Sequence, residues 1–199
     1  MAPLLHTSET LAEPPGFFVR YRMKITLLMP ALLLGVAWCA GPATLAAPWW
    51  AGGIACVVLG IALRLWASGY LRKEETLIRW GPFAFLRNPL YAGTFLIGSG
   101  FALLTGRWES LPLLLAGMLA VYLPTARYEE RILLARFGEA FRDYCRVVPP
   151  WFPRLTRPAA FPAGEPFSWS LLYFNGEHRH LILQLALLGV FYLVHLVKG

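Results

Sequence analysis

The stretch Gly81-Pro-Phe-Ala-Phe-Leu-Arg-Asn-Pro-Leu-Tyr-Ala-Gly93 lies where a basic segment runs into a long apolar one. Asn88 suits the N-cap of a helix, and Pro89 suits the first helical turn, where its missing N–H removes no intrahelical bond. We therefore expect a helix from Pro89 onward. Arg87, Asn88 and Tyr91 should cluster at its start.

Composition and charge place the chain in a membrane. Of the 199 residues, 57% are hydrophobic and 15% are charged, whereas ordinary soluble domains have about 45–50% and about 25%. No charged residue occurs between Lys24 and Arg64, and none between Arg87 and Arg107. Gaps of this length are typical of membrane spans, which need about 20 mainly apolar residues each. The sequence therefore predicts an all-α integral membrane protein.

The apolar stretches divide into about five transmembrane helices. Gly41-Pro42 and Pro48 break the first gap, and Ser110 with Pro112 marks a later helix start. The predicted helices are Ile25–Cys39, Trp49–Tyr70, Pro89–Leu104, Leu111–Ala126 and Leu181–Val197. We expect one membrane domain, with an N-terminal segment 1–23, four helices in 24–126, a cytoplasmic catalytic segment 127–180 that caps the bundle and binds the cofactor, and the fifth helix in 181–199.

A secretory signal peptide is an alternative interpretation of the first helix. Ala43-Thr-Leu-Ala46 offers the small residues that a cleavage site needs. The long polar lead before the helix and the immediate return into a second apolar stretch favour a retained membrane helix instead.

Basic residues are divided unequally between the loops. Fifteen of the 18 Lys and Arg residues precede the first helix or lie between helices two and three or four and five, whereas only Arg107 and Lys198 lie on the other side. Cytoplasmic loops carry such an excess. We therefore expect an inner-membrane protein with its N-terminus and both motif segments in the cytoplasm. Anionic lipid headgroups account for the net charge of +7, so no nucleic-acid partner is expected.

Cysteine and histidine spacing indicates no metal site. Cys39, Cys56 and Cys145 form no pair with metal-ligand spacing, and the four histidines are scattered. A disulfide framework is not expected either. The sequence also has no phosphate-binding loop and no dinucleotide glycine fingerprint.

The cytoplasmic segment divides into a helical part and a proline-rich part. Arg127–Arg146 has one glycine and no proline, so it should continue helix four, with Leu133, Leu134, Phe137, Phe141 and Tyr144 on one apolar side. Pattern alone is also satisfied by an amphipathic helix that lies on the membrane surface. Val147–Pro166 holds six prolines and is either a linker or a lid folded back over the bundle.

Four short elements follow one another between Arg64 and Arg154. They are Gly81-Pro-Phe83, Arg87-Asn-Pro-Leu-Tyr-Ala-Gly93, Glu129-Glu130-x-x-Leu133-x-x-x-Phe137-Gly138-x-x-Phe141-x-x-Tyr144, and Val148-Pro149. In this order and spacing they resemble the isoprenylcysteine carboxyl methyltransferase family and the related phospholipid N-methyltransferases. Asn88 stands where the eukaryotic enzymes usually carry histidine, and Phe83 where the family often has tyrosine.

The resemblance implies methyl transfer from S-adenosylmethionine, with S-adenosylhomocysteine as product, to a lipid or prenylated acceptor at the cytoplasmic face. The start of the third helix suits the cofactor carboxylate. The residues expected to bind the cofactor are Gly81, Phe83, Arg87, Asn88, Pro89, Tyr91, Gly93 and Glu130. The residues expected to act in catalysis are Glu129, Glu130 and Arg146, the last by holding the substrate.

Each of these residues also has a purely structural interpretation. Arg87 satisfies the charge rule for cytoplasmic loops, Tyr91 suits an aromatic belt, and Glu129-Glu130 suits a solvated surface. Arg64, late in helix two, either extends its charge to the interface or lines the cofactor cavity.

Three functional classes follow from the sequence. The first is a membrane methyltransferase acting on a carboxylate or an amine. The second is a small membrane reductase with a nicotinamide cofactor, because sterol-reductase catalytic halves have a similar helix layout. The third is a non-catalytic membrane scaffold. The small size and the Glu129-Glu130 pair favour the methyltransferase.

Overall fold

A computed structural model describes residues 16–39, 47–72, 76–158, 161 and 164–198. The predicted N-terminal segment up to residue 15 and the Ala43–Ala46 stretch lie outside these residues. The described part contains helices and no strand. Its elements are α1 (Phe17–Cys39), α2 (Ala47–Ser68), the 3-10 turn η2 (Gly81–Ala84), α3 (Pro89–Leu104), α4 (Ser110–Phe137), α5 (Glu139–Val147), α6 (Trp169–Phe174) and α7 (Glu177–Lys198).

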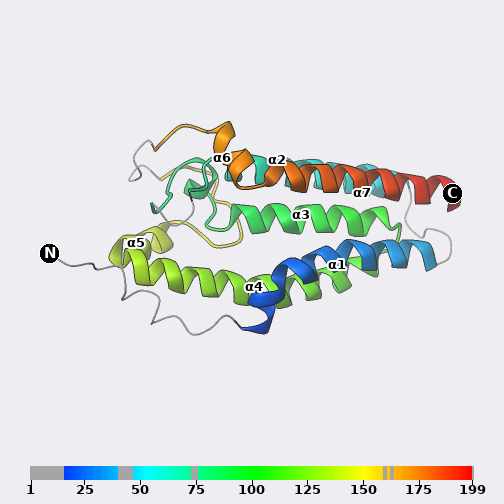
Figure 1. The fold of residues 1–199 in the computed structure, drawn as a ribbon, viewed down its shortest axis with the longest axis horizontal. Helices are drawn as coiled ribbons and strands as arrows, with labels where there is room; N and C mark the ends of the chain where they lie inside the picture. Colours follow the sequence, from blue (N-terminus) through cyan, green and yellow to red (C-terminus); the bar gives the residue numbers. More distant parts are fainter. Residues whose placement is uncertain (1–15, 40–46, 73–75, 159–160, 162–163, 199) are drawn as a thin grey trace.

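Five long helices, α1, α2, α3, α4 and α7, lie side by side and alternate in direction (Figure 1). Three of them are long and apolar enough to cross a membrane, namely Pro48–Ser68, Ser110–Phe137 and Glu177–Val197, while the apolar parts of α1 (Leu28–Cys39) and α3 are shorter. This confirms the predicted all-α membrane class. η2, α5 and α6 gather at one end of the bundle, here called the capped end, and the C-terminal end of α7 lies at the other (Figure 1).

Several helix bounds differ from the prediction for local reasons. α3 spans Pro89–Leu104 as expected, whereas α4 continues past Ala126 to Phe137. The prediction of one helix through Arg146 is wrong, because the chain turns at Gly138, where φ is +54° and ψ is −124°. Glycine alone adopts such torsions without a steric penalty. α5 therefore leaves α4 at an angle.

Helices α2 and α3 approach each other through four glycines. A Cβ added to Gly60 would lie 2.6 Å from the Gly93 carbonyl oxygen, and one added to Gly100 would lie 2.5 Å from the Gly53 carbonyl oxygen. Small residues at a helix interface let the two backbones come this close in a membrane protein. We call Gly53, Gly60, Gly93 and Gly100 the glycine seam; it fixes α3 against α2.

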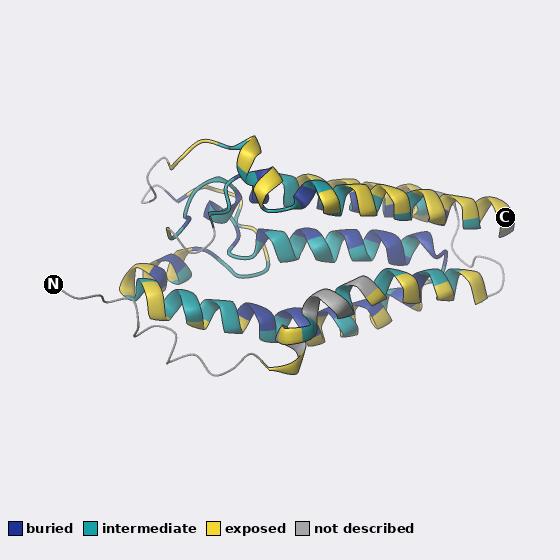
Figure 2. Ribbon diagram, in the orientation of Figure 1, coloured by how far each residue is buried: buried dark blue, intermediate teal, exposed yellow. Residues whose placement is uncertain are grey.

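Each of the five long helices contributes to one apolar core. Leu33, Val57, Phe101, Leu114 and Phe191 come from α1, α2, α3, α4 and α7 and are all nearly inaccessible to solvent. The outward faces of the same helices are exposed (Figure 2) and mostly apolar on α7. A second cluster, formed by Ala84, Phe141, Tyr144, Val148 and Phe161, packs the capped end. The bundle thus presents apolar walls and one polar, folded end.

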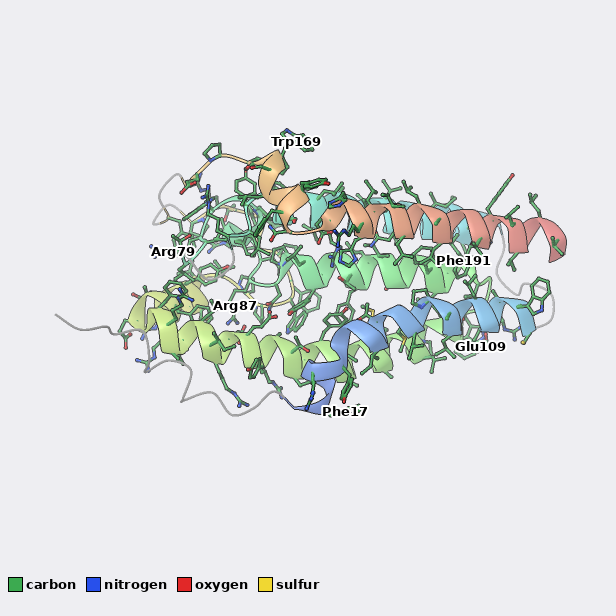
Figure 3. All side chains as sticks on the ribbon, in the orientation of Figure 1. Phe17, Arg79, Arg87, Glu109, Trp169 and Phe191 are labelled. Carbon is green, nitrogen blue, oxygen red and sulfur yellow. The ribbon has the colours of Figure 1, made fainter. Side chains whose placement is uncertain are left out.

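Charged side chains concentrate at the capped end. Arg79 and Arg87 lie there, whereas Glu109 lies in the turn at the opposite end (Figure 3). The arginines of α5 and of the C-terminal half of α4 belong to the same end. The motif residues are therefore placed where the apolar bundle meets its polar end.

Candidate functional site

The chain segment before α3 is tied to the chain segment after α5. The Arg87 backbone N–H donates to the Pro149 carbonyl (2.9 Å), and the Arg154 N–H donates to the Phe85 carbonyl (3.0 Å). Asn88 adds a side-chain bond to the Pro150 carbonyl (3.1 Å). Residues 149–154, here called the strap, are therefore folded back on the motif. This part of the proline-rich segment is not an open linker.

Asn88 occupies the N-cap position of α3 but does not cap the helix with its side chain. The predicted position is therefore right and the predicted capping bond is absent. Its amide donates to the strap instead, and Pro89 begins the helix as expected. Trp151 on the strap packs edge-on against Phe95 of α3, with ring centroids 5.9 Å apart.

Arg87 joins three elements at the capped end. Its Nη1 lies 3.0 Å from Glu130 Oε1 on α4 and donates at 3.0 Å to Cys145 Sγ on α5. The Arg87 and Glu130 side chains are 16% and 30% exposed, so the pair is partly desolvated. Arg87 Nε is buried and has no hydrogen-bond partner among the described residues. The two sequence motifs therefore meet through one guanidinium group.

Burial perturbs two groups on α5. Burial raises the pKa of the Cys145 thiol; the Arg87 guanidinium opposes this rise and the Glu130 carboxylate adds to it. Burial likewise raises the pKa of Tyr144 above its ordinary range. The Tyr144 hydroxyl donates to the Phe83 carbonyl (2.7 Å), so it fixes α5 to η2. At neutral pH both groups are uncharged.

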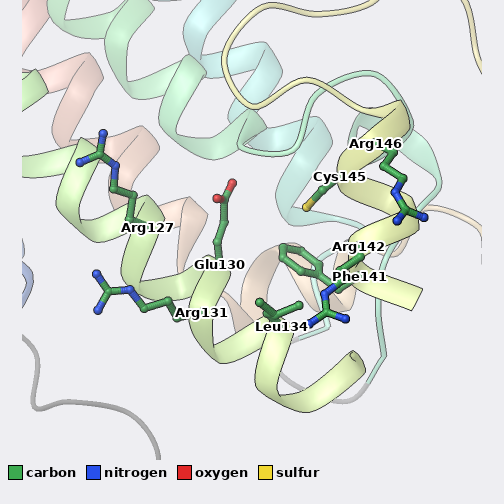
Figure 4. Close-up of a pocket in the computed structure, with 8 residues that line it drawn as sticks. All are labelled: Arg127, Glu130, Arg131, Leu134, Phe141, Arg142, Cys145 and Arg146. Atoms are coloured by element: carbon green, nitrogen blue, oxygen red, sulfur yellow. The ribbon is translucent and has the colours of Figure 1, made fainter. Parts of the chain in front are cut away.

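A pocket of about 540 Å³ opens between α4 and α5 (Figure 4). Figure 4 shows Glu130 and Cys145 on its two sides, Leu134 and Phe141 between the helices, and Arg127 and Arg131 directed away from α5. The residues that line it are Arg127, Glu130, Arg131, Leu134, Phe141, Arg142, Cys145 and Arg146. The pocket thus has an apolar floor, one carboxylate and an arginine-rich rim.

The predicted site residues are only partly brought together. Glu130 and Arg146 line the pocket, and Arg87 and Asn88 contact its surroundings. Gly81, Phe83, Pro89, Tyr91, Gly93 and Glu129 are not among its lining residues. Tyr91 packs on Tyr122 (5.0 Å between centroids), and Gly93 belongs to the glycine seam.

Sequence reasoning missed several lining residues, Cys145 among them. One signal was present: Arg127, Glu130, Arg131 and Leu134 recur at spacings of three and four, which places them on one face of a helix. No such signal marked Cys145, because its place in the pocket depends on the turn at Gly138. Within the described residues, no group of three or more His, Cys, Asp or Glu side chains could hold a metal ion.

The sequence of this chain matches the model of one protein family. Residues 36–140 match the phospholipid methyltransferase family model. The chain belongs to that family. The match covers α2, η2, α3 and α4 and includes Arg87 and Glu130, and it confirms the predicted relationship to the isoprenylcysteine carboxyl methyltransferases and their phospholipid-methylating relatives. Methyl transfer and a membrane location are properties of this family.

Two curated proteins are similar to this family member. The cobalt-zinc-cadmium resistance protein CzcN of Cupriavidus metallidurans is 32% identical over 144 residues, which are 68% of this chain and 63% of CzcN. The nickel-cobalt-cadmium resistance protein NccN of Alcaligenes xylosoxydans xylosoxydans is 29% identical over 148 residues, 71% of this chain and 68% of NccN. The chain thus spans less than two thirds of CzcN. No solved structure matches it.

Proposed function

We propose that this protein transfers a methyl group from S-adenosylmethionine to a carboxylate or amine on a lipid or prenylated acceptor at the cytoplasmic membrane face. The observation that carries the proposal is the Arg87–Glu130 contact of 3.0 Å. It joins the two motif segments beside a pocket at the capped end of the apolar bundle. A site for a polar cofactor and a lipid acceptor requires this junction of polar and apolar surroundings.

The pocket fits the proposed cofactor in size and chemistry. Its volume of about 540 Å³ falls in the range of roughly 300–1,000 Å³ that small-molecule sites occupy. Glu130 offers a carboxylate to ribose hydroxyls or an ammonium, and the rim arginines offer donors to a carboxylate. When bound, S-adenosylmethionine supplies a methyl carbon activated by a sulfonium charge.

The residues of this chain would then bind the cofactor, orient the acceptor and exclude water. Arg87 holds the Glu130 carboxylate in place, and Arg146 lies on the rim for an anionic acceptor group. Leu134 and Phe141 supply an apolar floor, which lowers the access of water to the reacting groups. Because displacement at carbon needs alignment, positioning should provide much of the acceleration. An amine acceptor must first lose a proton, for which Glu130 is the candidate base.

Cofactor binding tests the proposal. Purified protein titrated with S-adenosylmethionine and, separately, with NADPH should bind the first and not the second. Glu130→Gln and Arg87→Ala should each weaken binding by at least about tenfold, because hydrogen bonds to charged groups contribute about 1.5–3 kcal/mol.

Arg107→Ala is the matched control, because Arg107 forms an exposed pair with Glu109 away from the pocket. It should bind S-adenosylmethionine like the parent. NADPH binding would instead support a reductase, and binding of neither ligand would support a scaffold. Parent-like affinity in both pocket variants would show that the site lies elsewhere.

Acceptor chain length tests the lipid half of the proposal. An acceptor carried on a hydrophobic chain should enter sideways from the bilayer, because the strap covers the start of α3. Affinity should rise with chain length, on the order of 0.8 kcal/mol for each further CH₂ that is buried. Equal turnover of short-chain and long-chain acceptors with the same headgroup, measured in nanodiscs, would exclude bilayer recognition.

A further inference from the structure

Arg64, late in α2, belongs to an ionic cluster outside the pocket. Its Nε donates to Glu177 Oε2 (3.1 Å) and its Nη2 to Glu177 Oε1 (2.6 Å), at the start of α7. The two side chains are 15% and 7% exposed. A buried ion pair adds little net stability because desolvation offsets the attraction. The role of this pair is therefore to be sought in the elements that it holds in place.

The remaining donor of Arg64 reaches the first turns of α3. Nη1 donates to Thr94 Oγ1 (2.6 Å) and, more weakly, to the Leu90 carbonyl (3.4 Å). Thr94 Oγ1 donates in turn to the same carbonyl (2.9 Å). The arginine stem runs along the glycine seam, since a Cβ on Gly93 would lie 2.6 Å from Arg64 Cγ. Arg64 is therefore bonded to α7 and α3 and is not among the residues that line the pocket.

We propose that Arg64 is a positioning residue that, held by Glu177, fixes the start of α3 and thereby places Arg87 between Glu130 and Cys145. The pocket is lined from α4 and α5, so α7 acts on it through this ion pair. Arg64 lies within the matched residues 36–140, whereas Glu177 lies beyond them. The expected effect of Arg64 on cofactor affinity rests on the proposed function, whereas its expected effect on the accessibility of Cys145 does not.

Thr94→Val separates positioning from folding. The substitution keeps the side-chain shape and the Arg64–Glu177 pair but removes the shorter of the two hydrogen bonds from Arg64 to α3. Its matched control is Thr125→Val, because Thr125 is buried and also donates to the carbonyl four residues earlier (2.6 Å). Both changes are made in the full chain with Cys39→Ala and Cys56→Ala, which leaves Cys145 as the single thiol.

Two readouts are measured on each variant and on Glu177→Gln. The first is the maleimide labelling rate of Cys145, and the second is the Kd for S-adenosylmethionine, which is a property of the folded protein and does not depend on how much of the sample is folded. Thr94→Val and Glu177→Gln should raise the labelling rate and the Kd by about three- to tenfold, the effect of losing roughly one hydrogen bond of ordinary net strength. Thr125→Val should leave both within about twofold.

The outcomes distinguish this inference from the proposed function. If the parent binds no S-adenosylmethionine but Thr94→Val and Glu177→Gln still label faster than the parent, the positioning role of Arg64 is supported and the proposed cofactor is rejected. If Thr94→Val labels and binds like Thr125→Val and only the melting temperature changes, Arg64 is structural and the inference is overturned.

Discussion

The Asn88 side-chain amide donates a 3.1 Å hydrogen bond to the Pro150 carbonyl, which joins residues 62 positions apart. The bond holds the strap against the start of α3. The same turn carries Arg87, whose guanidinium contacts α4 and α5. One short segment therefore connects the strap with the pocket.

Asn88→Asp should loosen the strap, because a carboxylate cannot donate to the Pro150 carbonyl and would repel it. Trypsin should then cleave after Arg154 several times faster than in the parent, since loss of a hydrogen bond of about 1 kcal/mol raises the open population about fivefold. Cleavage sites can be read by mass spectrometry. Asn175→Asp is the control, because the Asn175 amide at the end of α6 donates in the same way to the Ser68 carbonyl of α2. Equal cleavage in both variants would contradict a tether at Asn88.

Alkylation of Cys145 should depend on pH in a defined direction. Because burial raises the pKa of this thiol and the thiolate is the nucleophile, alkylation should be slow at neutral pH. The rate should rise through a midpoint above that of an ordinary thiol. Arg87→Ala should move the midpoint further up, since it removes the opposing positive charge, and Glu130→Gln should move it down.

The Cys145 rates are measured with iodoacetamide in the single-thiol background. A midpoint at or below that of a free thiol would show that Cys145 is not buried beside Glu130. Protection by S-adenosylmethionine would additionally locate the cofactor in the pocket between α4 and α5.

The glycine seam predicts a contrast between two glycines on α2. Gly60→Ala would place a Cβ 2.6 Å from the Gly93 carbonyl oxygen and should destabilise the protein by about 1–3 kcal/mol through overpacking. Gly52→Ala enters open space and should be neutral or stabilising by up to about 1 kcal/mol, owing to helix propensity. Thermal unfolding in one detergent compares them, and a Gly60 variant as stable as the Gly52 variant would contradict close backbone packing.

Membrane orientation follows from the charges and from the alternating helices. A reporter fused after Gly199 should be found outside the cytoplasm, because α7 runs from the arginine-rich capped end to the opposite end and positive charge is retained in the cytoplasm. A reporter placed before α1 should be cytoplasmic. A cytoplasmic signal from the C-terminal fusion would show that α7 runs in the opposite direction or does not cross the membrane.

Local signals predicted the helices well. Asn88-Pro89 marks the start of α3, and its bounds agree with the prediction because a proline in the first turn and an uncharged run leave few alternatives. The α4–α5 break was missed, because a single glycine inside an amphipathic pattern is compatible with a continuous helix. Only the backbone torsions at Gly138 distinguish the two cases.

Only those site residues that belong to a recognisable sequence motif could be predicted. Arg87 and Glu130 were identified through the family resemblance, and the structure brings them into contact. The bonds from Asn88 to Pro150 and from Arg64 to Glu177 join residues 62 and 113 positions apart. The sequence contains no periodic pattern that indicates such pairs, because tertiary packing determines which residues meet. Cys145 was hidden for the same reason.

The turn at Gly138 gives the pocket an unusual dependence. Among the described residues, no atom beyond the glycine and its chain neighbours lies within 4 Å of the Cβ position there, so no side chain packs against the turn itself. The torsions at Gly138, the Tyr144–Phe83 bond further along α5 and the Arg87 contacts to Glu130 and Cys145 together set how far the α5 side of the pocket stands from Glu130. The width of the opening therefore depends in part on one glycine, and any other residue at that position would strain the turn.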